Sequence, residues 1–299
     1  MMSCGSGLQR ISERIASVTA TADGTVCALG AQSGRIYVRG DSGVFSRLDD
    51  MEEFISVSPF RDDMLFALGH DGLYIVTSSG KTVSHCGFTS YWTAETVLRY
   101  NPADNMLYIA YGIGFKGDAF VVSGNEMSPS QVYVPMDLLD VAFLGSDTVF
   151  SIDGKGLQFV RPGATDEVNS RNTGLPGNVV KTMTVDRQGN LWLGIYRCGL
   201  SVLSGTMSNF SMLHSAGDCD IVTAVCPAGD GSGILYVGYD GGGLGVLDLD
   251  TGRSEVFDTS NSGIPGNNVL SVIRDDEWLY LGIYTVSYTH LRAHETRRH

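Results

Sequence analysis

Short apolar runs alternate with polar, glycine-rich turns along most of this chain. Residues 178–203 show one complete unit, in which the run VVKTMTV meets the turn DRQGN before the runs LWLGI and LSVL follow. Each run has four to seven residues, contains many β-branched and aromatic side chains, and is bounded by Gly, Asn or Asp. This pattern predicts short β-strands joined by hairpins.

The unit recurs with an even period. When the copies are aligned on the aromatic residue of LWLG, successive members of this column lie 39 to 44 residues apart. The column residues are Cys27, Phe66, Tyr108, Phe150, Trp192, Tyr236 and Tyr280. About 40–45 residues is the size of one four-stranded propeller blade. We therefore predict an all-β fold, a seven-bladed β-propeller. A sandwich of irregular hairpins is the alternative, but it would not keep so even a period.

The two ends of the chain modify this ring. The seventh repeat supplies only the strands 269–273 and 279–283 before the pattern breaks, so the last blade is expected to be incomplete. An open blade leaves an unpaired edge. We expect residues 8–15 to close it from outside, as an N-terminal strand, and residues 285–291 to imitate its third strand. The propeller domain is assigned to residues 1–285.

Residues 286–299, VSYTHLRAHETRRH, depart from the repeat in composition and pattern. They carry three of the six histidines and resemble translated sequencing-adapter sequence, so we interpret them as a non-native tail. A genuine basic C-terminal extension is the alternative.

Composition excludes several functional classes. The 299 residues carry a formal net charge of −13, which argues against a nucleic-acid surface because such a surface needs a basic footprint. No run of 18 apolar residues occurs, and the first ten residues lack the apolar region of a secretory signal. We therefore expect either a cytoplasmic protein or a fragment that lacks its front. The six cysteines show no zinc-ligand spacing, and disulfides stay open.

Two stretches of the later repeats resemble a known family. GLPGNVVKTMTVDRQGNLWLGIYRCGLSVL and GIPGNNVLSVIRDDEWLYLGIY are similar to the two-component regulator propeller repeat. The resemblance is specific over residues 172–285 and weaker over residues 15–165. It departs from the family pattern at Cys198, which replaces a Gly, and at three positions where the family usually has Thr. Those three are Ile195, Tyr239 and Ile283.

This resemblance implies a function. The family's propellers build the periplasmic sensor part of hybrid histidine kinases, many of which respond to oligosaccharides. By resemblance, the chain is a non-catalytic ligand-sensing propeller, a fragment of a periplasmic, membrane-anchored sensor. Its implied partners are an oligosaccharide or another small ligand and the attached kinase and regulator domains. A homodimer of the full-length protein stays open.

No catalytic motif stands out. GxSxG, HExxH, Walker A and full GxGxxG patterns are absent from the sequence. The glycine-rich run GYDGGGLG joins two strands and is read as a hairpin. His214, Cys219 and Cys226 fit no standard metal spacing. The turns Asp186–Asn190 and Asp230–Gly233 are read as Asx turns rather than calcium loops. We expect no catalytic residue, metal or cofactor.

One face of the propeller collects the candidate ligand-binding residues. In an up-and-down blade, the loop after the second strand shares a face with the linker into the first strand. Aromatic faces there could stack on sugar rings while fixed donors and acceptors bind the hydroxyls. We predict that the ligand is bound by Tyr196, Arg197, Tyr239, Asp240, Tyr284, His70, Tyr111 and Asp153. The simpler alternative is that tyrosine is common at strand ends.

Two other functions remain open at this level. A propeller enzyme, a lyase or a glycosidase, would need several carboxylates, or His and Arg, converging on the axis in one layer. The loop positions vary between blades, and two of the seven offer only Gln32 or aromatic residues. A secreted scaffold propeller that binds protein partners cannot be separated from a sensor by sequence.

Overall fold

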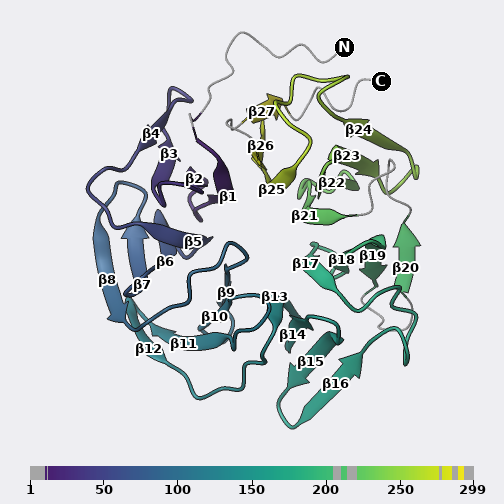
Figure 1. Cartoon of the computed structure of the whole chain (residues 1–299), viewed down its shortest axis with the longest axis horizontal. Helices are drawn as coiled ribbons and strands as arrows, with labels where there is room; N and C mark the ends of the chain where they lie inside the picture. The colour runs from purple at the N-terminus through teal and green to yellow at the C-terminus, as the bar shows by residue number, and fades with distance from the viewer. Residues whose placement is uncertain are drawn as a thin grey trace. The chain divides into compact units, whose positions relative to one another are not determined.

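The computed structural model describes residues 11, 13–204, 210–213, 221–275, 278–284 and 289–292. These residues form strands β1 to β27 and contain no helix (Figure 1). In every sheet the strands pair with their neighbours in chain order, as in up-and-down blades. None of the described residues belongs to a helix that could cross a membrane.

Residues 11–139 form one compact unit of three four-stranded sheets, here called blades 1 to 3. Blade 1 contains β1 (Ile15–Ala20), β2 (Val26–Gly30), β3 (Ile36–Arg39) and β4 (Phe45–Arg47). Blade 2 contains β5 (Phe54–Pro59), β6 (Met64–Gly69), β7 (Gly72–Thr77) and β8 (Thr82–Gly87). Blade 3 contains β9 (Val97–Asn101), β10 (Met106–Ala110), β11 (Asp118–Ser123) and β12 (Glu126–Pro129).

The described residues from 140 onward belong to a second compact unit. Blade 4 contains β13 (Leu138–Leu144), β14 (Asp147–Ile152), β15 (Gly156–Arg161) and β16 (Ala164–Val168). Blade 5 contains β17 (Val180–Val185), β18 (Leu191–Ile195), β19 (Gly199–Leu203) and β20 (Phe210–Leu213). Blade 6 contains β21 (Val222–Pro227), β22 (Ile234–Tyr239), β23 (Gly243–Asp248) and β24 (Ser254–Phe257). A three-stranded sheet follows, with β25 (Val269–Arg274), β26 (Trp278–Ile283) and β27 (Thr289–Arg292).

The all-β propeller fold is confirmed, but the predicted number of seven blades is corrected. Six sheets of the described chain are complete four-stranded blades, and the seventh repeat gives a sheet of three strands. The third strand expected within residues 285–291 is β27, which pairs antiparallel with β26. Residues 285–288 and 293–299 lie outside the described residues, so the origin of the tail stays a prediction.

The expected N-terminal closing strand is not found in the described chain. Ile15 begins β1 and pairs with Gly30 of β2, so this residue belongs to blade 1 rather than to the last sheet. Residues 8–10 and 12 lie outside the described residues. The physical reason is register, because the apolar alternation of β1 already begins at Ile15, which is fully buried.

The seven column residues lie in the second strands and are all buried, as predicted from their mid-strand positions. Trp192 of β18 is 3% exposed and packs with Val222, Leu235 and Val237 of blade 6. Tyr236 of β22 packs in the same way with residues of β25 and β26. The column therefore forms the contact between successive blades within each unit, where burial of large apolar side chains contributes most to stability.

The turns Asp186–Asn190 and Asp230–Gly233, which join the first and second strands of blades 5 and 6, are Asx turns, as predicted. The carboxylate of Asp186 accepts hydrogen bonds from the backbone N–H of Gln188 at 2.9 Å and of Asn190 at 2.8 Å. Its second oxygen accepts from the indole Nε1–H of Trp192 at 2.8 Å. Burial raises the pKa of Asp186, but these hydrogen bonds outweigh burial and hold the pKa below its usual value. The turn thus fixes both the hairpin and the orientation of the column residue.

The glycine-rich run GYDGGGLG is the β22–β23 hairpin, as predicted. Gly243, the first residue of β23, has φ +79°, and a Cβ there would lie 2.2 Å from the carbonyl oxygen of Phe257. Gly241, earlier in the same hairpin, has φ +88° but no atom within 4 Å of its Cβ position. Only Gly243 is therefore required by close approach of the neighbouring strand as well as by its dihedral angle.

Candidate ligand-binding face

Most of the residues predicted to bind a ligand occupy the same position in their repeats. We call the residue that directly follows the second strand of each repeat the post-strand residue. The seven post-strand residues are Ala31, His70, Tyr111, Asp153, Tyr196, Asp240 and Tyr284. Six of them are residues predicted to bind a ligand, so the sequence alignment placed this loop correctly.

Backbone hydrogen bonds hold several of these loops alike. The N–H of Tyr196 donates to the carbonyl oxygen of Val179 at 2.8 Å, and the N–H of Tyr284 donates to that of Asn268 at 2.8 Å. In both cases the acceptor is the residue just before the first strand of the same sheet. Asp240 makes the equivalent bond at 3.0 Å and Ala31 makes it at 2.8 Å. The post-strand loop and the incoming linker are therefore fixed to each other at the same end of these sheets.

Tyr196 and Arg197 form an exposed pair in the β18–β19 loop. Tyr196 is 38% exposed, and the guanidinium carbon of Arg197 lies 5.3 Å from the centre of its ring. Arg197 has φ +57°, in the left-handed region that non-glycine residues rarely adopt. Such an outlier costs about 1–3 kcal/mol and is often found where function requires the conformation. The pair offers an aromatic face and a cation side by side.

Asn268 brings Asp240 and Tyr284 together across two successive sheets. Its side-chain Nδ2–H donates to the Asp240 carboxylate, and its carbonyl oxygen accepts from the N–H of Tyr284. Asp240 and Asn268 also form an isolated β-bridge. Tyr284 is 52% exposed, and Asp240 is exposed as well. A carboxylate, an amide and an open aromatic ring thus lie next to one another on the surface.

Tyr239 does not present its side chain on this face. It is 2% exposed, and its ring covers Gly245, where a Cβ would lie 2.9 Å from the Tyr239 Cε2 atom. Tyr239 pairs with Val222 as Ile195 pairs with Val180. Tyr239 is therefore the last residue of β22 and belongs to the core, and the exposed residue Asp240 follows it. The sequence held a signal for this, because Tyr239 aligns with Ile195, an apolar residue at the end of the corresponding run.

Asp153, Tyr111 and His70 have different surroundings from one another. Asp153 is half-buried in the β14–β15 turn. Tyr111 is 1% exposed, and its hydroxyl donates to Asp118 Oδ2 at 2.9 Å. Burial raises the pKa of Tyr111 above its usual value, with Asp118 adding to the effect. The Tyr111 side chain is therefore part of the core beneath the β10–β11 loop and is not available on the surface. His70 is exposed, and its ring stacks on Trp92 with ring centres 3.3 Å apart.

Sequence reasoning missed two exposed aromatic residues, Tyr91 and Trp92, in the linker between β8 and β9. They are 48% and 46% exposed. The signal was present in the string FTSYWTAET, where two adjacent aromatic residues stand in a polar linker. Linkers have no alternation that assigns one side chain to the core, so the periodic pattern gave these residues no weight.

Two linkers contain the sequence Pro-Gly-Asn, at residues 172–180 and 261–270, and both are held by hydrogen bonds of their asparagine side chains. In the first, Asn178 Oδ1 accepts from the Ser170 N–H at 2.8 Å. In the second, Asn267 Oδ1 accepts from the Thr259 N–H at 2.9 Å. Asn172 and Asn261 likewise donate their side-chain N–H to the carbonyl oxygens of Glu167 and Val256, at 2.7 and 2.8 Å. The asparagine amides of both linkers are thus used to lock the backbone in the same way.

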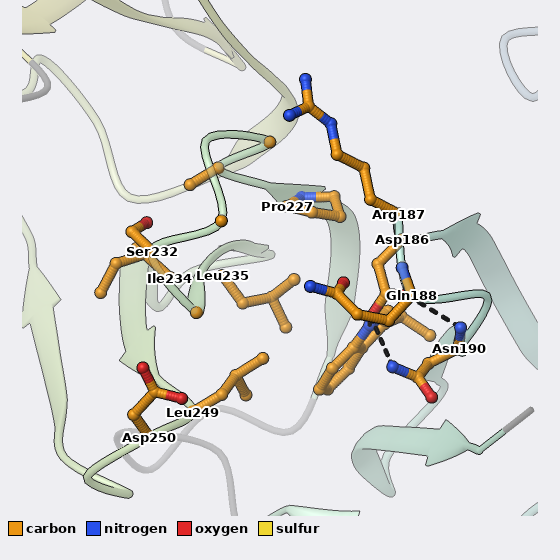
Figure 2. A pocket seen from close by; sticks show the side chains of 15 residues that line it. Asp186, Arg187, Gln188, Asn190, Pro227, Ser232, Ile234, Leu235, Leu249 and Asp250 are labelled. Atoms are coloured by element: carbon orange, nitrogen blue, oxygen red, sulfur yellow. Dashed lines mark hydrogen bonds between the residues drawn. The ribbon is translucent and has the colours of Figure 1, made fainter.

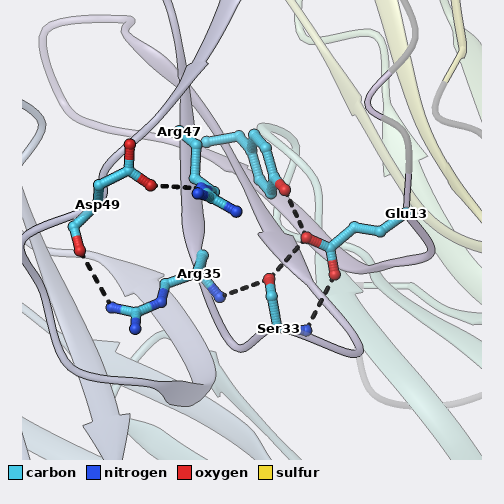
Figure 3. A network of polar contacts seen from close by, with 6 residues as sticks. Glu13, Ser33, Arg35, Arg47 and Asp49 are labelled. Carbon is cyan, nitrogen blue, oxygen red and sulfur yellow. Dashed lines mark hydrogen bonds and ion pairs between the residues drawn. The ribbon is translucent and has the colours of Figure 1, made fainter.

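In blade 1, Glu13 closes the β2–β3 loop (Figure 3). Its carboxylate accepts from the backbone N–H of Ser33 at 3.0 Å, from the Ser33 hydroxyl at 2.6 Å and from the hydroxyl of Tyr37. Burial raises the pKa of Glu13, but the hydrogen bonds outweigh burial and hold the pKa below its usual value. Burial and the bond to Glu13 raise the pKa of Tyr37 to about 12. Gln32 is held here through its N–H, at 3.3 Å from Glu13.

This network gives a pH-dependent prediction. Glu13→Gln should lower the free energy of unfolding by about 0.5–1 kcal/mol at neutral pH, because the site is largely solvent-screened. A depressed folded-state pKa contributes stability above the unfolded pKa, and the contribution is lost as pH falls through the folded value. The difference between wild type and variant should therefore shrink below about pH 4. Urea titrations across this pH range measure it, and a constant difference would contradict the assignment.

A small pocket lies at the opposite end of the strands, between blades 5 and 6 (Figure 2). Its volume is about 160 Å³, with the β17–β18 turn on one side and the β21–β22 turn on the other. Pro227, Leu235 and Leu249 supply its apolar lining, and Arg187 and Gln188 stand at its edge. Ligand pockets usually measure about 300–1,000 Å³, so an oligosaccharide would not fit inside. None of the predicted site residues lines this pocket.

Within the described residues, no group of three or more His, Cys, Asp and Glu side chains is arranged to hold a metal ion. Cys27, Cys86, Cys198 and Cys226 are free thiols.

The chain resembles the two-component regulator propeller family, as its sequence predicts. Residues 174–197 match the family described as two component regulator propeller. This stretch holds the end of the first Pro-Gly-Asn linker, strands β17 and β18, and the pair Tyr196 and Arg197. No curated protein sequence matches the chain.

Solved structures with the same fold include extracellular domains of two component systems and a lyase. The extracellular domains of two putative hybrid two component systems from B. thetaiotaomicron have TM-scores of 0.70 and 0.71 at 12% and 13% identity. The alignments cover 95% of this chain but 39% and 41% of those chains. Virginiamycin B lyase from Staphylococcus aureus has a TM-score of 0.71 at 11% identity, with 96% and 99% of the two chains covered. At such identities the similarity establishes the fold alone.

Proposed function

We propose that this chain is a non-catalytic, ligand-sensing propeller from the extracytoplasmic part of a hybrid two-component regulator, and that its ligand is an oligosaccharide. The family match over residues 174–197 supports the regulator context. The fold shared with extracellular domains of putative hybrid two component systems is consistent with a periplasmic location. The chain spans about 40% of those sensor chains, so attached kinase and regulator domains are part of the proposal, as is a homodimer of the full protein.

The observation that carries the proposal is the surface around Asn268. Tyr284 offers an exposed ring, Asp240 offers a carboxylate, and Asn268 holds both in place through its side chain and backbone. Sugar rings stack their C–H faces on aromatic rings, and their hydroxyls bind to fixed carboxylates and amides. Tyr196 and Arg197 offer a similar combination at the equivalent loop of blade 5. Loops that are already hydrogen-bonded lose little entropy on binding.

A catalytic role is the alternative, because virginiamycin B lyase has the same fold. Catalysis would need acid and base groups that converge in one layer. The post-strand residue instead differs from repeat to repeat and is Ala, His, Tyr or Asp. This variation supports recognition of an irregular ligand over a shared catalytic constellation. A scaffold that binds protein partners through this face is the third alternative.

Calorimetric titration with a panel of oligosaccharides tests the proposal. Tyr284→Ala and Asp240→Ala should each weaken binding of the recognised oligosaccharide about tenfold or more, because each removes a contact that the other cannot replace. Leu249→Ala is the matched control, since Leu249 is exposed at the opposite end of blade 6. If Tyr284→Ala and Asp240→Ala both bind the oligosaccharide as tightly as the control variant and wild type do, the ligand is bound elsewhere. Release of a cleaved sugar during the titration would favour the enzyme.

A further inference from the structure

A second surface, in the first compact unit, concentrates exposed apolar side chains. Among the described residues, eleven large hydrophobic side chains are exposed. Seven of these lie between residues 91 and 136, and six of the seven, all except Val121 of β11, lie in loops or linkers. We call these six the aromatic patch: Tyr91, Trp92, Ile113, Val132, Tyr133 and Met136. Contiguous exposed apolar surface is uncommon on soluble proteins and usually marks an interaction site.

Specific contacts join the three segments that carry the aromatic patch. The Tyr91 ring packs on Phe115, with ring centres 4.6 Å apart. Phe115 lies in the β10–β11 loop, and its carbonyl oxygen accepts from the N–H of Asp137 at 3.0 Å. Lys116 and Met136 form a β-bridge in the same place. The linkers before β9 and before β13 therefore both meet the β10–β11 loop, which brings the three segments of the aromatic patch together.

Two of the three exposed rings of the patch, those of Tyr91 and Trp92, are held by contacts with other rings. Trp92 stacks on His70 with an angle of 12° between the rings, so one face of the indole is covered while almost half of the residue stays open. Tyr91 is fixed edge-to-face against Tyr111, with ring centres 5.1 Å apart. Rigid aromatic side chains provide binding area with little loss of side-chain entropy.

The composition of the aromatic patch favours a protein partner over a sugar. Ile113, Val132 and Met136 are aliphatic or thioether side chains with no donor or acceptor for sugar hydroxyls. Trp, Tyr and Met are enriched in the buried centres of protein interfaces, whereas sugar sites need many fixed polar groups.

Carboxylates on the blade 2 side indicate the charge of the partner. Asp71 follows His70 directly, with its side chain 65% exposed. Phe54 pairs with Gly69, which places the exposed residues Glu52 and Glu53 beside the same loop. Lys116 is the basic residue of the β10–β11 loop. The whole chain carries a net charge of −13, so a second copy would be repelled and a basic partner attracted.

We propose that the aromatic patch is a docking surface for a basic, amphipathic protein segment, whose apolar side chains cover Trp92 and Tyr133 while its Lys or Arg residues face the neighbouring carboxylates. This partner differs from the oligosaccharide of the proposed function, and none of the six patch residues belongs to the Asn268 region.

Three synthetic peptides test the proposal: one alternating Lys and Leu, one alternating Lys and Ser, and one alternating Glu and Leu. Fluorescence anisotropy of labelled peptides measures their affinity at low and physiological salt. The Lys–Leu peptide should bind wild type about tenfold or more tightly than either other peptide, and salt should weaken it. The double variant Trp92→Ser/Tyr133→Ser should lose about tenfold or more of this affinity, since aromatic anchors dominate interfaces. Val44→Ser is the control, because Val44 is exposed on blade 1, outside the patch.

The outcomes separate the alternatives. If the Lys–Ser peptide binds as tightly as the Lys–Leu peptide, net charge alone explains binding. If the Glu–Leu peptide binds as tightly, the carboxylates play no part. Either result overturns the proposal. Unchanged Lys–Leu binding by the double variant would also overturn it. Sedimentation of the chain alone reports self-association, and a dimer that the double variant abolishes would replace the proposed partner with a second copy. The single variant Trp92→Ser, with an unchanged near-ultraviolet circular dichroism spectrum, guards against misfolding of the double variant.

Discussion

Replacing Trp192 with alanine should lower the free energy of unfolding by about 3–5 kcal/mol. The indole is 3% exposed, fills the contact between blades 5 and 6, and donates to Asp186 from the hairpin turn. The variant would leave a cavity between the blades and an Asp186 oxygen without its indole donor, so two penalties act together. Urea denaturation followed by circular dichroism measures the loss.

Trp92→Ala is the matched control for this substitution, because the same change is made to an exposed tryptophan in a linker. It should alter the free energy of unfolding by less than about 0.5 kcal/mol. A loss below about 1 kcal/mol for Trp192→Ala would show that the column residue does not form the core contact assigned to it.

Gly243→Ala should lower the free energy of unfolding by about 2–4 kcal/mol. The added methyl group would lie 2.2 Å from the Phe257 carbonyl oxygen, a backbone atom of the neighbouring strand β24. To relieve this clash, β23 and β24 must move apart at the end of blade 6. That movement would disturb the start of the linker that follows Phe257. Thermal and urea denaturation both measure the effect.

Gly241→Ala separates the two causes of the Gly243 effect. Gly241 has a similar positive φ but open space around its Cβ position, so its substitution should cost only about 1 kcal/mol of dihedral strain. Similar losses for the two variants would mean that the left-handed backbone alone explains the requirement for glycine, and that strand contact adds nothing.

The sequence predicted the propeller repeat well because each strand must alternate buried and exposed side chains. That constraint identified Trp192 and the other column residues as core, and it placed the loops after the second strands on one end of each sheet. The same alternation limits the prediction at strand ends. Tyr239 lies one residue before the surface position that Asp240 occupies, and a shift of one residue moves a side chain from the surface to the core.

Other features could not be read from the pattern. The stack of His70 on Trp92 joins a strand-end loop to a linker, and neither segment has a period that predicts contact. The last sheet of the described chain has three strands, and Ile15, which was expected in the closing strand, instead begins β1 of blade 1. Pairing between distant segments depends on which edge is free, which local propensity does not encode.

The locked linkers have a consequence for the kinetics of recognition. Both Pro-Gly-Asn segments use their asparagine amides to hold their own backbone, so these loops are already in place before a ligand arrives. Association then needs no slow ordering step, and its rate is set by diffusional encounter and orientation. Differences in affinity among related ligands should consequently appear as differences in how long each one stays bound rather than in how fast each one arrives.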